Sequence, residues 1–309
     1  MRPSASRARP AAPLQISHLK TEGERNWHKI DRVFERLSQA RDAGASVAFH
    51  RYPYIAFQTG LSSLFPKWSE DGGTDPFLAR LADGDLSEKL QSAVKEKVVL
   101  IGGWDNVLIS SVSSEADRKA ENQRLGSYAR ALGREPYDVA VSLLIGSHAD
   151  VGMVCFAMSE RNLERFLAHP LAMICSDGGA VAIEDAGHEG HPHPRTLGTF
   201  PRVLGVYARE KRVLTLPQAI YKMAGFTASR VKLGDRWRLA PGFAADIVIF
   251  DPATVADCAS FANPLQYPVG IRTVLVNGEP AILEGERRET RDGRALRPST
   301  YTIQEQKKS

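Results

Sequence analysis

Three side chains capable of metal binding or acid–base chemistry stand at the ends of apolar runs. His18, His50 and Asp177 end or follow the runs at 14–18, 45–50 and 171–175. Such runs are typical of buried parallel strands, and barrel enzymes keep catalytic groups at the carboxyl ends of these strands. Ser176-Asp177-Gly178 is the most informative of the three, although Asp-Gly alone is also a common turn dipeptide.

Two imidazoles and a carboxylate together suit a divalent metal centre, with Zn²⁺ as the expected ion. Such an ion lowers the pKa of bound water to about 7, and a neighbouring aspartate can take and deliver the proton. Each residue has a structural alternative: His18 could cap a strand, and His50 could pack against Tyr52 and Tyr54. Taken jointly with Asp177, they favour a metal site.

His188, His191 and His193 look like a metal cluster but lie in a loop rich in Gly and Pro, where no strand or helix sets ligand directions. We expect this loop to be a lid or substrate loop rather than a metal site. Arg195 is the charged residue of this loop that we expect to bind substrate, because a guanidinium can donate two hydrogen bonds to a carboxylate. The alternative for Arg195 is an ordinary surface arginine.

The remaining candidate residues favour structural roles. His28, His148 and His169 do not end strands, and Cys175 has no histidine base at a suitable spacing. A cysteine nucleophile is therefore not expected. The chain also contains no Gly-x-Ser-x-Gly elbow and no Walker-type phosphate loop.

Composition restricts the classes of partner and compartment. The 309 residues are 43% hydrophobic and 25% charged with a net charge of +4, which is ordinary for a globular protein. No basic face with interleaved aromatics argues for nucleic acid, and no apolar run is long enough to span a membrane. Three widely spaced cysteines indicate thiols in a reducing compartment, hence a cytoplasmic protein. Residues 1–13 are expected to be a disordered leader.

The order of elements predicts an α/β protein. A strand at 14–18, a helix from Asn26 to about Gly44 and a strand at 45–50 form a βαβ unit with a parallel pair. A long excursion at 55–96 follows, then apolar runs at 97–102 and 150–156 with helical segments near 115–132 and 136–146 between them. A helix capped by Ser159 precedes the strand at 171–176. Helices at 199–211 and 216–228 and strands at 246–250 and 270–278 complete the pattern.

The sequence resembles the N-acyl-D-amino-acid deacylases (D-aminoacylases) of the amidohydrolase superfamily. The matching stretches run along nearly the whole chain: Gln15-Ile-Ser-His-Leu-Lys20, Tyr52-Pro-Tyr54, Thr59-Gly-Leu61, Met158-Ser-Glu160, His169-Pro170 through Gly178, His193-Pro-Arg195, Gly198 to Gly205, Leu239-Ala-Pro-Gly242, Ala245-Asp246, Phe250-Asp-Pro252, Gln266-Tyr-Pro268 and Val276-Asn-Gly278.

The resemblance implies a metal-dependent (β/α) barrel of the TIM type that hydrolyses the amide of an N-acyl-D-amino acid. It implies His18 and His50 as zinc ligands and Asp177 as the general acid and base. Arg195, together with His193, would bind the small-molecule substrate. Residues 14–234 would be part of the barrel, and 235–309 a small β subdomain.

One departure from the family is large. The family begins with a small β segment and a strand carrying a His-x-His metal motif, whereas the seventeen residues before His18 contain no histidine and no cysteine. About half the barrel is missing, which predicts the C-terminal part of a longer enzyme. Three hypotheses stay open: a deacylase completed by a separately encoded N-terminal half or a homo-oligomer, an inactive remnant, and a hydantoinase-like or dihydroorotase-like enzyme on cyclic amides.

Overall fold

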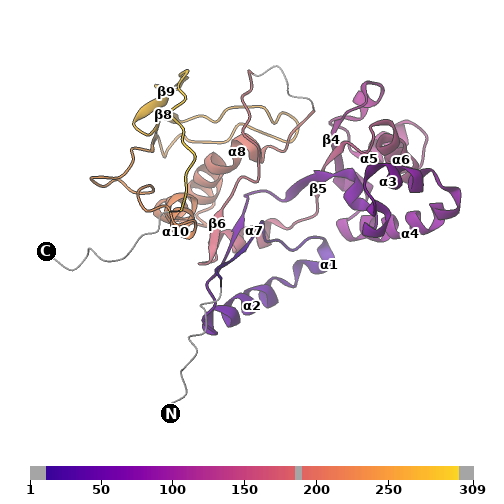
Figure 1. Cartoon of the computed structure of the whole chain (residues 1–309), viewed down its shortest axis with the longest axis horizontal. Helices are drawn as coiled ribbons and strands as arrows, with labels where there is room; N and C mark the ends of the chain where they lie inside the picture. The colour runs from indigo at the N-terminus through magenta and orange to yellow at the C-terminus, as the bar shows by residue number, and fades with distance from the viewer. Residues whose placement is uncertain (1–11, 185–189, 299–309) are drawn as a thin grey trace, which may run out of the picture.

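The computed structural model describes residues 12–184 and 190–298 and shows an α/β protein with three small sheets (Figure 1). The first sheet is wholly parallel, in the order β1-β2-β6, with β1 at Leu14–Ile16, β2 at Val47–Arg51 and β6 at Ala172–Ile174. Helix α1 (Glu24–Trp27) and helix α2 (Ile30–Asp42) connect β1 to β2. The predicted βαβ unit is therefore confirmed.

Helices cover one face of this sheet. A cluster of buried apolar residues joins α2 and α7 (Glu160–Ala168) to the strands, and its members are Ile30, Leu37, Val47, Phe49, Phe166 and Ala172. Ser159 caps α7 as predicted, because its hydroxyl accepts the backbone N–H of Asn162. The alternation of side chains along β2 turns Phe49 toward the helices and His50 toward the opposite face.

A second sheet lies between β2 and α7 in the sequence, and it is antiparallel. Its order is β3-β5-β4, with β3 at Ala56–Gly60, β5 at Val151–Phe156 and β4 at Val107–Val112. It has its own hydrophobic core and its own helices beside it in Figure 1. These are α3 (Thr74–Ala82), α4 (Gly84–Ile101), α5 (Leu125–Ala131) and α6 (Pro136–Gly146), with short 3₁₀ turns at Leu61–Leu64, Lys67–Glu70, Trp104–Asn106 and Glu115–Ala120.

Two expectations for this region need refinement. The apolar run at 97–102 is the end of helix α4, because Leu90, Val94 and Val98 recur at helical spacing and are buried, whereas Val99 is 66% exposed. The run at 150–156 does form a strand, β5, but that strand pairs only with antiparallel neighbours.

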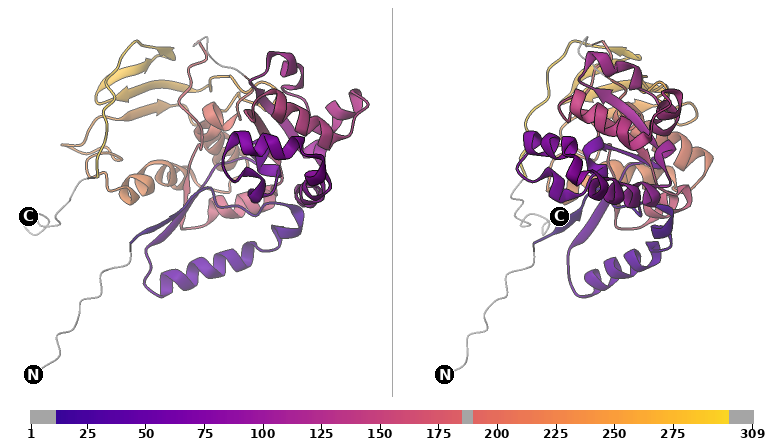
Figure 2. Two further views of the ribbon diagram at one scale, coloured as in Figure 1. Left: turned by 45° about the vertical axis from the view of Figure 1, so that its right-hand side comes forward. Right: turned by 90° about the vertical axis from the view of Figure 1, so that its right-hand side faces the viewer.

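Residues 195–287 contain a helical layer and a third sheet (Figure 2). The helical layer consists of α8 (Arg195–Arg202), a π-helical continuation at Val203–Glu210, α9 (Leu216–Ile220), a π-helical turn at Tyr221–Gly225 and α10 (Phe226–Arg230). The third sheet is antiparallel, in the order β10-β9-β8-β7, from β7 (Ile247–Phe250), β8 (Ile271–Val276), β9 (Glu279–Leu283) and β10 (Glu286–Arg287). The predicted helices and strands after residue 195 are confirmed.

Within the described residues, no helix is both long and apolar enough to cross a membrane.

A buried lysine supports the turn that leads into β6. The ammonium of Lys222 donates hydrogen bonds to the carbonyls of His169 and Ala172, at 2.6 and 3.1 Å, and the residue is 6% exposed. Burial lowers the pKa of Lys222 to about 8. The charged form is thus disfavoured in the folded state relative to the unfolded chain.

This lysine predicts a stability that rises with pH. Between pH 8 and the ordinary lysine pKa of 10.5, the unfolded chain keeps the proton that the folded chain releases, so the free energy of unfolding increases. The increment reaches about 3 kcal/mol, since one pKa unit corresponds to about 1.4 kcal/mol. Burial of Cys155 and Cys175 raises the pKa of both thiols and acts in the opposite direction over this range, so the increment is measured relative to Lys222→Met, which keeps both cysteines. In urea denaturation, the wild type and the exposed-site control Lys119→Met should each gain about 3 kcal/mol over Lys222→Met between pH 8 and pH 10.5. The same pH dependence in all three proteins would contradict the assignment.

Candidate active site at the edge of the parallel sheet

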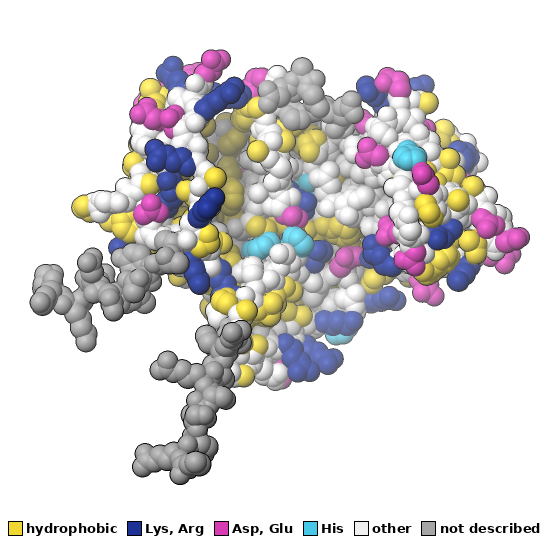
Figure 3. Space-filling view, in the orientation of Figure 1, with side chains coloured by type: hydrophobic (Ala, Val, Ile, Leu, Met, Phe, Trp, Pro, Cys, Tyr) yellow, Lys and Arg dark blue, Asp and Glu magenta, His cyan; other side chains and the backbone are white. Residues whose placement is uncertain are grey.

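The structure brings His18, His50 and Asp177 together at the carboxyl edge of the parallel sheet. His18 follows β1 by two residues, His50 lies in β2, and Asp177 follows β6 by three residues. Because the three strands are parallel and in register, their carboxyl ends share one edge. Figure 3 shows histidine side chains, in cyan, near the middle of the molecular surface that is turned toward the viewer.

The two imidazoles face each other and are neutral at pH 7. The backbone N–H of His18 donates to His50 Nδ1 at 3.1 Å, and the ring centroids are 5.8 Å apart, edge to face. Burial lowers the pKa of both rings. The Asp177 carboxylate opposes this effect at His18, whereas the charge of His18 adds to it at His50. Neutral imidazoles keep one nitrogen lone pair, which a metal ligand requires. In His50 that lone pair is on Nδ1 and accepts the His18 N–H, so metal binding by His50 requires this hydrogen bond to break.

The Asp177 carboxylate lies between a histidine and an arginine. One oxygen is 3.8 Å from His18 Nε2, and the other is 2.9 Å from Arg195 Nη1. Asp177 has a left-handed backbone with φ of 51°, a conformation that aspartate tolerates better than most residues. Gly178 is required next, because a Cβ there would lie 2.7 Å from the Cα of Thr196. This close approach sets the start of α8 against the carboxylate.

Arg195 is the first residue of α8 and is only 6% exposed. Its guanidinium stacks on the ring of Tyr52, with 4.8 Å from Cζ to the ring centroid, while it pairs with Asp177. Its Nε and Nη1 atoms have no hydrogen-bond partner among the residues that the structure describes, so the 2.9 Å contact with Asp177 is an ion pair without an aligned hydrogen bond. A buried guanidinium with a free donor beside a carboxylate is well suited to exchange that carboxylate for one on a ligand.

His193 was expected to bind substrate, and the structure places it behind Arg195. The side chain is 0% exposed, and each ring nitrogen has a backbone partner, Ala56 O at 3.1 Å and the N–H of Arg195 at 3.0 Å. Burial lowers the pKa of His193 to about 3, so the ring is neutral.

The rest of the histidine-rich loop gathers no metal donors in the described part of the chain. His188 lies outside the described residues. His191 donates its backbone N–H to the Ser110 carbonyl, which fastens the loop to β4.

Three residues near the site were not predicted to belong to it. Tyr52 lies two positions beyond His50, its hydroxyl is buried, and that hydroxyl has no hydrogen-bond partner among the described residues. Arg51 is buried beneath it, 4.3 Å from the Tyr52 ring. Lys20 packs over the ring of Phe57, and burial followed by the charge of Arg51 lowers its pKa. The two-residue spacing of Lys20 and Tyr52 from the candidate histidines was the available signal.

The donor chemistry fits zinc, but the described residues supply only part of a coordination shell. Imidazole nitrogen and carboxylate oxygen are ordinary zinc ligands. Within residues 12–184 and 190–298, however, no three side chains of His, Cys, Asp or Glu converge tightly enough to hold a metal ion. A metal at this edge therefore requires further ligands or a rearrangement of these side chains.

The three cysteines differ sharply in environment. Cys155 is 0% exposed, Cys175 Sγ lies 3.0 Å from His50 Nδ1, and Cys258 is exposed. Burial raises the pKa of both Cys155 and Cys175 to about 12. Because the thiolate is the reactive form, neither is suited to be a nucleophile.

These environments predict the result of a thiol titration. At pH 8 a disulfide reagent such as DTNB should modify Cys258 rapidly, and Cys155 and Cys175 only after unfolding in denaturant. The Cys258→Ser variant should therefore lose the fast phase and keep the slow one. A fast phase that survives in this variant would show that Cys155 or Cys175 is accessible in the folded chain.

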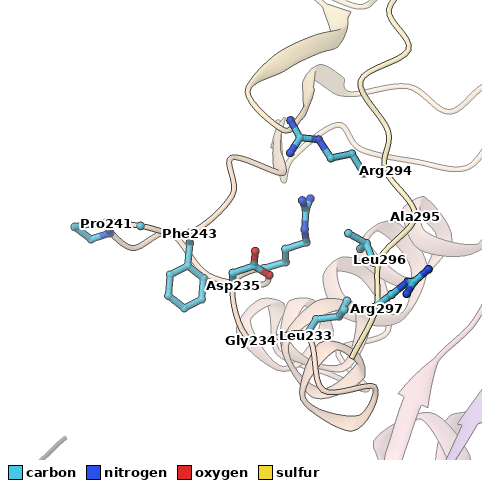
Figure 4. A pocket seen from close by; sticks show the side chains of 11 residues that line it. Leu233, Gly234, Asp235, Pro241, Phe243, Arg294, Ala295, Leu296 and Arg297 are labelled. Atoms are coloured by element: carbon cyan, nitrogen blue, oxygen red, sulfur yellow. The ribbon is translucent and has the colours of Figure 1, made fainter. Parts of the chain in front are cut away.

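A separate open pocket of about 600 Å³ lies between residues 233–243 and 294–297 (Figure 4). Arg236, Arg294 and Arg297 are among its lining residues, but none of the candidate site residues is. The candidate acid–base residues are at the sheet edge, and the acidic residue that lines this pocket is Asp235.

Known deacylases are similar to this chain in sequence and in structure. No protein-family model matches the chain. Among curated proteins, a D-aminoacylase of Alcaligenes xylosoxydans xylosoxydans is 34% identical over 87% of this chain and 45% of its own length. An N-acyl-D-glutamate deacylase of the same organism is 32% identical over 91% of this chain and 48% of its own length. An N-acyl-D-aspartate deacylase is 38% identical over 55% of this chain and 34% of its own length.

Solved structures agree in fold. The crystal structure of a D-aminoacylase, described as defining a novel subset of amidohydrolases, matches with a TM-score of 0.69 and 32% identity over 92% of this chain and 50% of that one. D-aminoacylase is also described with a binuclear metal centre. An N-acyl-D-glutamate deacylase from Bordetella bronchiseptica, complexed with zinc and a phosphonate inhibitor, matches with a TM-score of 0.66 and 30% identity over 87% of this chain and 46% of that one. The chain spans about half the length of these relatives. By sequence and by fold, it is similar to part of the N-acyl-D-amino-acid deacylases among the amidohydrolases.

Proposed function

We propose that this chain carries part of the active site of a metal-dependent deacylase. The reaction is hydrolysis of the amide bond of an N-acyl-D-amino acid, which yields a carboxylate and a free D-amino acid. The observation that carries the proposal is the Asp177 carboxylate, held between His18 and the buried guanidinium of Arg195. A proton-transfer group beside a carboxylate-binding group is what this substrate class requires.

Each residue has a distinct role in this proposal. Arg195 binds the substrate carboxylate, which replaces Asp177 as its partner. Asp177, released from that ion pair, takes a proton from the attacking water and delivers it to the leaving nitrogen. His18 and His50 hold zinc, their neutral rings supplying nitrogen ligands. Zinc, when bound, supplies a Lewis acid and favours deprotonation of water.

The proposed architecture is an incomplete TIM-type (β/α) barrel. Residues 14–234 form its C-terminal part, with the β3-β5-β4 sheet and its helices inserted, and residues 235–309 form the small β subdomain. Strand β1 supports this proposal, because it has a strand on only one side in the described sheet. A groove of about 510 Å³ between β1 and α2 is lined mostly by apolar side chains, Leu14 and Ile16 among them, together with Lys29, Arg32 and Arg36.

An uncovered apolar edge of this kind favours association. We propose that the remaining strands and metal ligands come from polypeptide outside residues 1–309, as a separately encoded N-terminal half, or that a second copy of the chain covers the edge. The three free cysteines support a cytoplasmic setting.

The test is the zinc content of the purified 309-residue chain, measured together with hydrolysis of N-acetyl-D- and N-acetyl-L-amino acids. D-selective turnover with about one zinc per chain supports a site that functions without further polypeptide. Turnover that appears only after addition of an N-terminal half from a related deacylase supports the partner-dependent form. Absence of D-selective turnover in both preparations would overturn the proposal.

The second candidate is a non-catalytic remnant that binds metal weakly or not at all. The observation that favours it is the absence, among the described residues, of three converging metal donors. Tight stoichiometric zinc in the purified chain would contradict this candidate, whatever the turnover.

A further inference from the structure

His193 connects three distant parts of the chain within the buried layer behind Arg195. Its ring lies 5.0 Å from the ring of Tyr54 and 5.0 Å from that of Phe261, measured between centroids and edge to face in both cases. Tyr54 follows β2, and Phe261 belongs to the segment between β7 and β8. Two aromatic rings at this spacing leave the imidazole little freedom to turn.

The hydrogen bonds of His193 define its tautomer. The backbone N–H of Arg195 can only donate, so Nδ1 of His193 must accept, at 3.0 Å. The proton of the neutral ring is then on Nε2, which donates to the Ala56 carbonyl at 3.1 Å. The backbone N–H of His193 donates to Gln58 Oε1 at 3.0 Å. The ring is thus anchored to β3 on one side and to the beginning of α8 on the other.

The bond to the Arg195 N–H acts where α8 begins. The first N–H groups of a helix have no partner within the helix, and an acceptor there fixes how the helix starts. The Arg195 backbone is held from behind by His193, while its guanidinium is stacked on Tyr52 and directed at Asp177. A small rotation of this first residue would move the guanidinium away from both.

We propose that His193 is a positioning residue, which influences the substrate only through Arg195 by fixing the first residue of α8. The proposal rests on the proposed function for the identity of the substrate. It replaces a direct substrate contact of His193 with an indirect one, because the ring is buried and both of its nitrogens are already bonded.

Two substitutions distinguish the hydrogen bond at Nδ1 of His193 from the hydrogen bond at Nε2. In His193→Asn the short side chain places an oxygen where Nδ1 was, so it can still accept the Arg195 N–H two residues ahead, as in an Asx turn. In His193→Gln the longer side chain can donate to the Ala56 carbonyl but does not present an acceptor to Arg195. Both variants lose the ring contacts with Tyr54 and Phe261, so both should unfold at lower urea concentration.

The readouts are the Arg195 Nε–Hε signal in ¹H–¹⁵N spectra of the full chain and the KM for N-acetyl-D-methionine and N-acetyl-D-glutamate. We expect His193→Asn to keep the wild-type Arg195 signal. We expect His193→Gln to shift it and to raise KM about tenfold, the effect of one lost hydrogen bond, with a smaller change in kcat.

Equal shifts of the Arg195 signal in both variants, or no shift in either, would overturn the proposal, because packing alone would then explain His193. The spectra need no turnover. Absence of hydrolysis both by the chain alone and after addition of an N-terminal half therefore refutes the proposed function without hiding the result for His193.

Discussion

Replacing Asp177 by Asn is expected to lower kcat for N-acyl-D-amino-acid hydrolysis by about 10² to 10⁴-fold, the usual contribution of a positioned acid–base group. Asparagine keeps the size of the side chain and an oxygen that can accept from Arg195, 2.9 Å away in the wild type, but it cannot carry the proton. We therefore expect KM to change much less than kcat. Steady-state kinetics on whichever preparation is active, the chain alone or completed by an N-terminal half, would measure both.

Asp257→Asn is the matched control for this substitution. Asp257 is also paired with an arginine, Arg202, at 3.1 Å, and its side chain is 7% exposed, but it faces none of the candidate site residues. The same chemical change there should reduce stability, because it weakens a largely buried ion pair, and leave turnover intact. Equal turnover of Asp177→Asn and wild type would remove Asp177 from the mechanism.

The parallel sheet and the edge that carries the site could be predicted because their signals are local. Apolar runs at 14–18, 45–50 and 171–175 each bury a strand, and one helix of suitable length between the first two implies a parallel pair. A polar side chain at the end of each run then lies at the same edge. This reasoning needs no knowledge of partners far away in the sequence.

The antiparallel β3-β5-β4 sheet could not be predicted in the same way. Strand β4 has no helical or turn signal that sets its partner, and it pairs with β5, more than 40 positions later in the chain. The run at 97–102 is short and apolar, and periodicity alone does not distinguish a short strand from the end of a helix. Only the upstream positions Leu90 and Val94 reveal the helical period.

The role of His193 also depends on contacts between distant residues. Its Nε2 bonds the carbonyl of a residue 137 positions away, and its ring packs on Phe261 from the C-terminal part. The resemblance to the deacylases, which includes His193-Pro-Arg195, implied a shared contact of His193 and Arg195 with substrate. Burial decides otherwise, because a ring with 0% exposure cannot touch a ligand that enters from solvent.

The helices behind the parallel sheet matter to the site because they hold β2 in place, and Phe166 is the centre of that contact. Its ring is 1% exposed and lies 5.4 Å from Phe34 of α2 and 6.0 Å from Phe49 of β2, between centroids. Phe166→Ala is expected to reduce the free energy of unfolding by about 3 to 5 kcal/mol, since the cavity adds to the lost apolar burial. The position next to Phe49 is His50, so loosening this layer also loosens one of the proposed zinc ligands.

Urea denaturation of Phe166→Ala beside Phe200→Ala would measure this contribution. Phe200 is 43% exposed on α8, so its truncation should change the unfolding free energy by less than about 1 kcal/mol. If Phe166→Ala lowers the free energy of unfolding no more than Phe200→Ala does, the helix layer does not stabilise the sheet. A large loss only in Phe166→Ala, with weaker zinc binding below the urea midpoint, would show that the hydrophobic layer and the proposed zinc site depend on the same strand. Strand β2 carries both Phe49, which packs in this layer, and His50, a proposed zinc ligand.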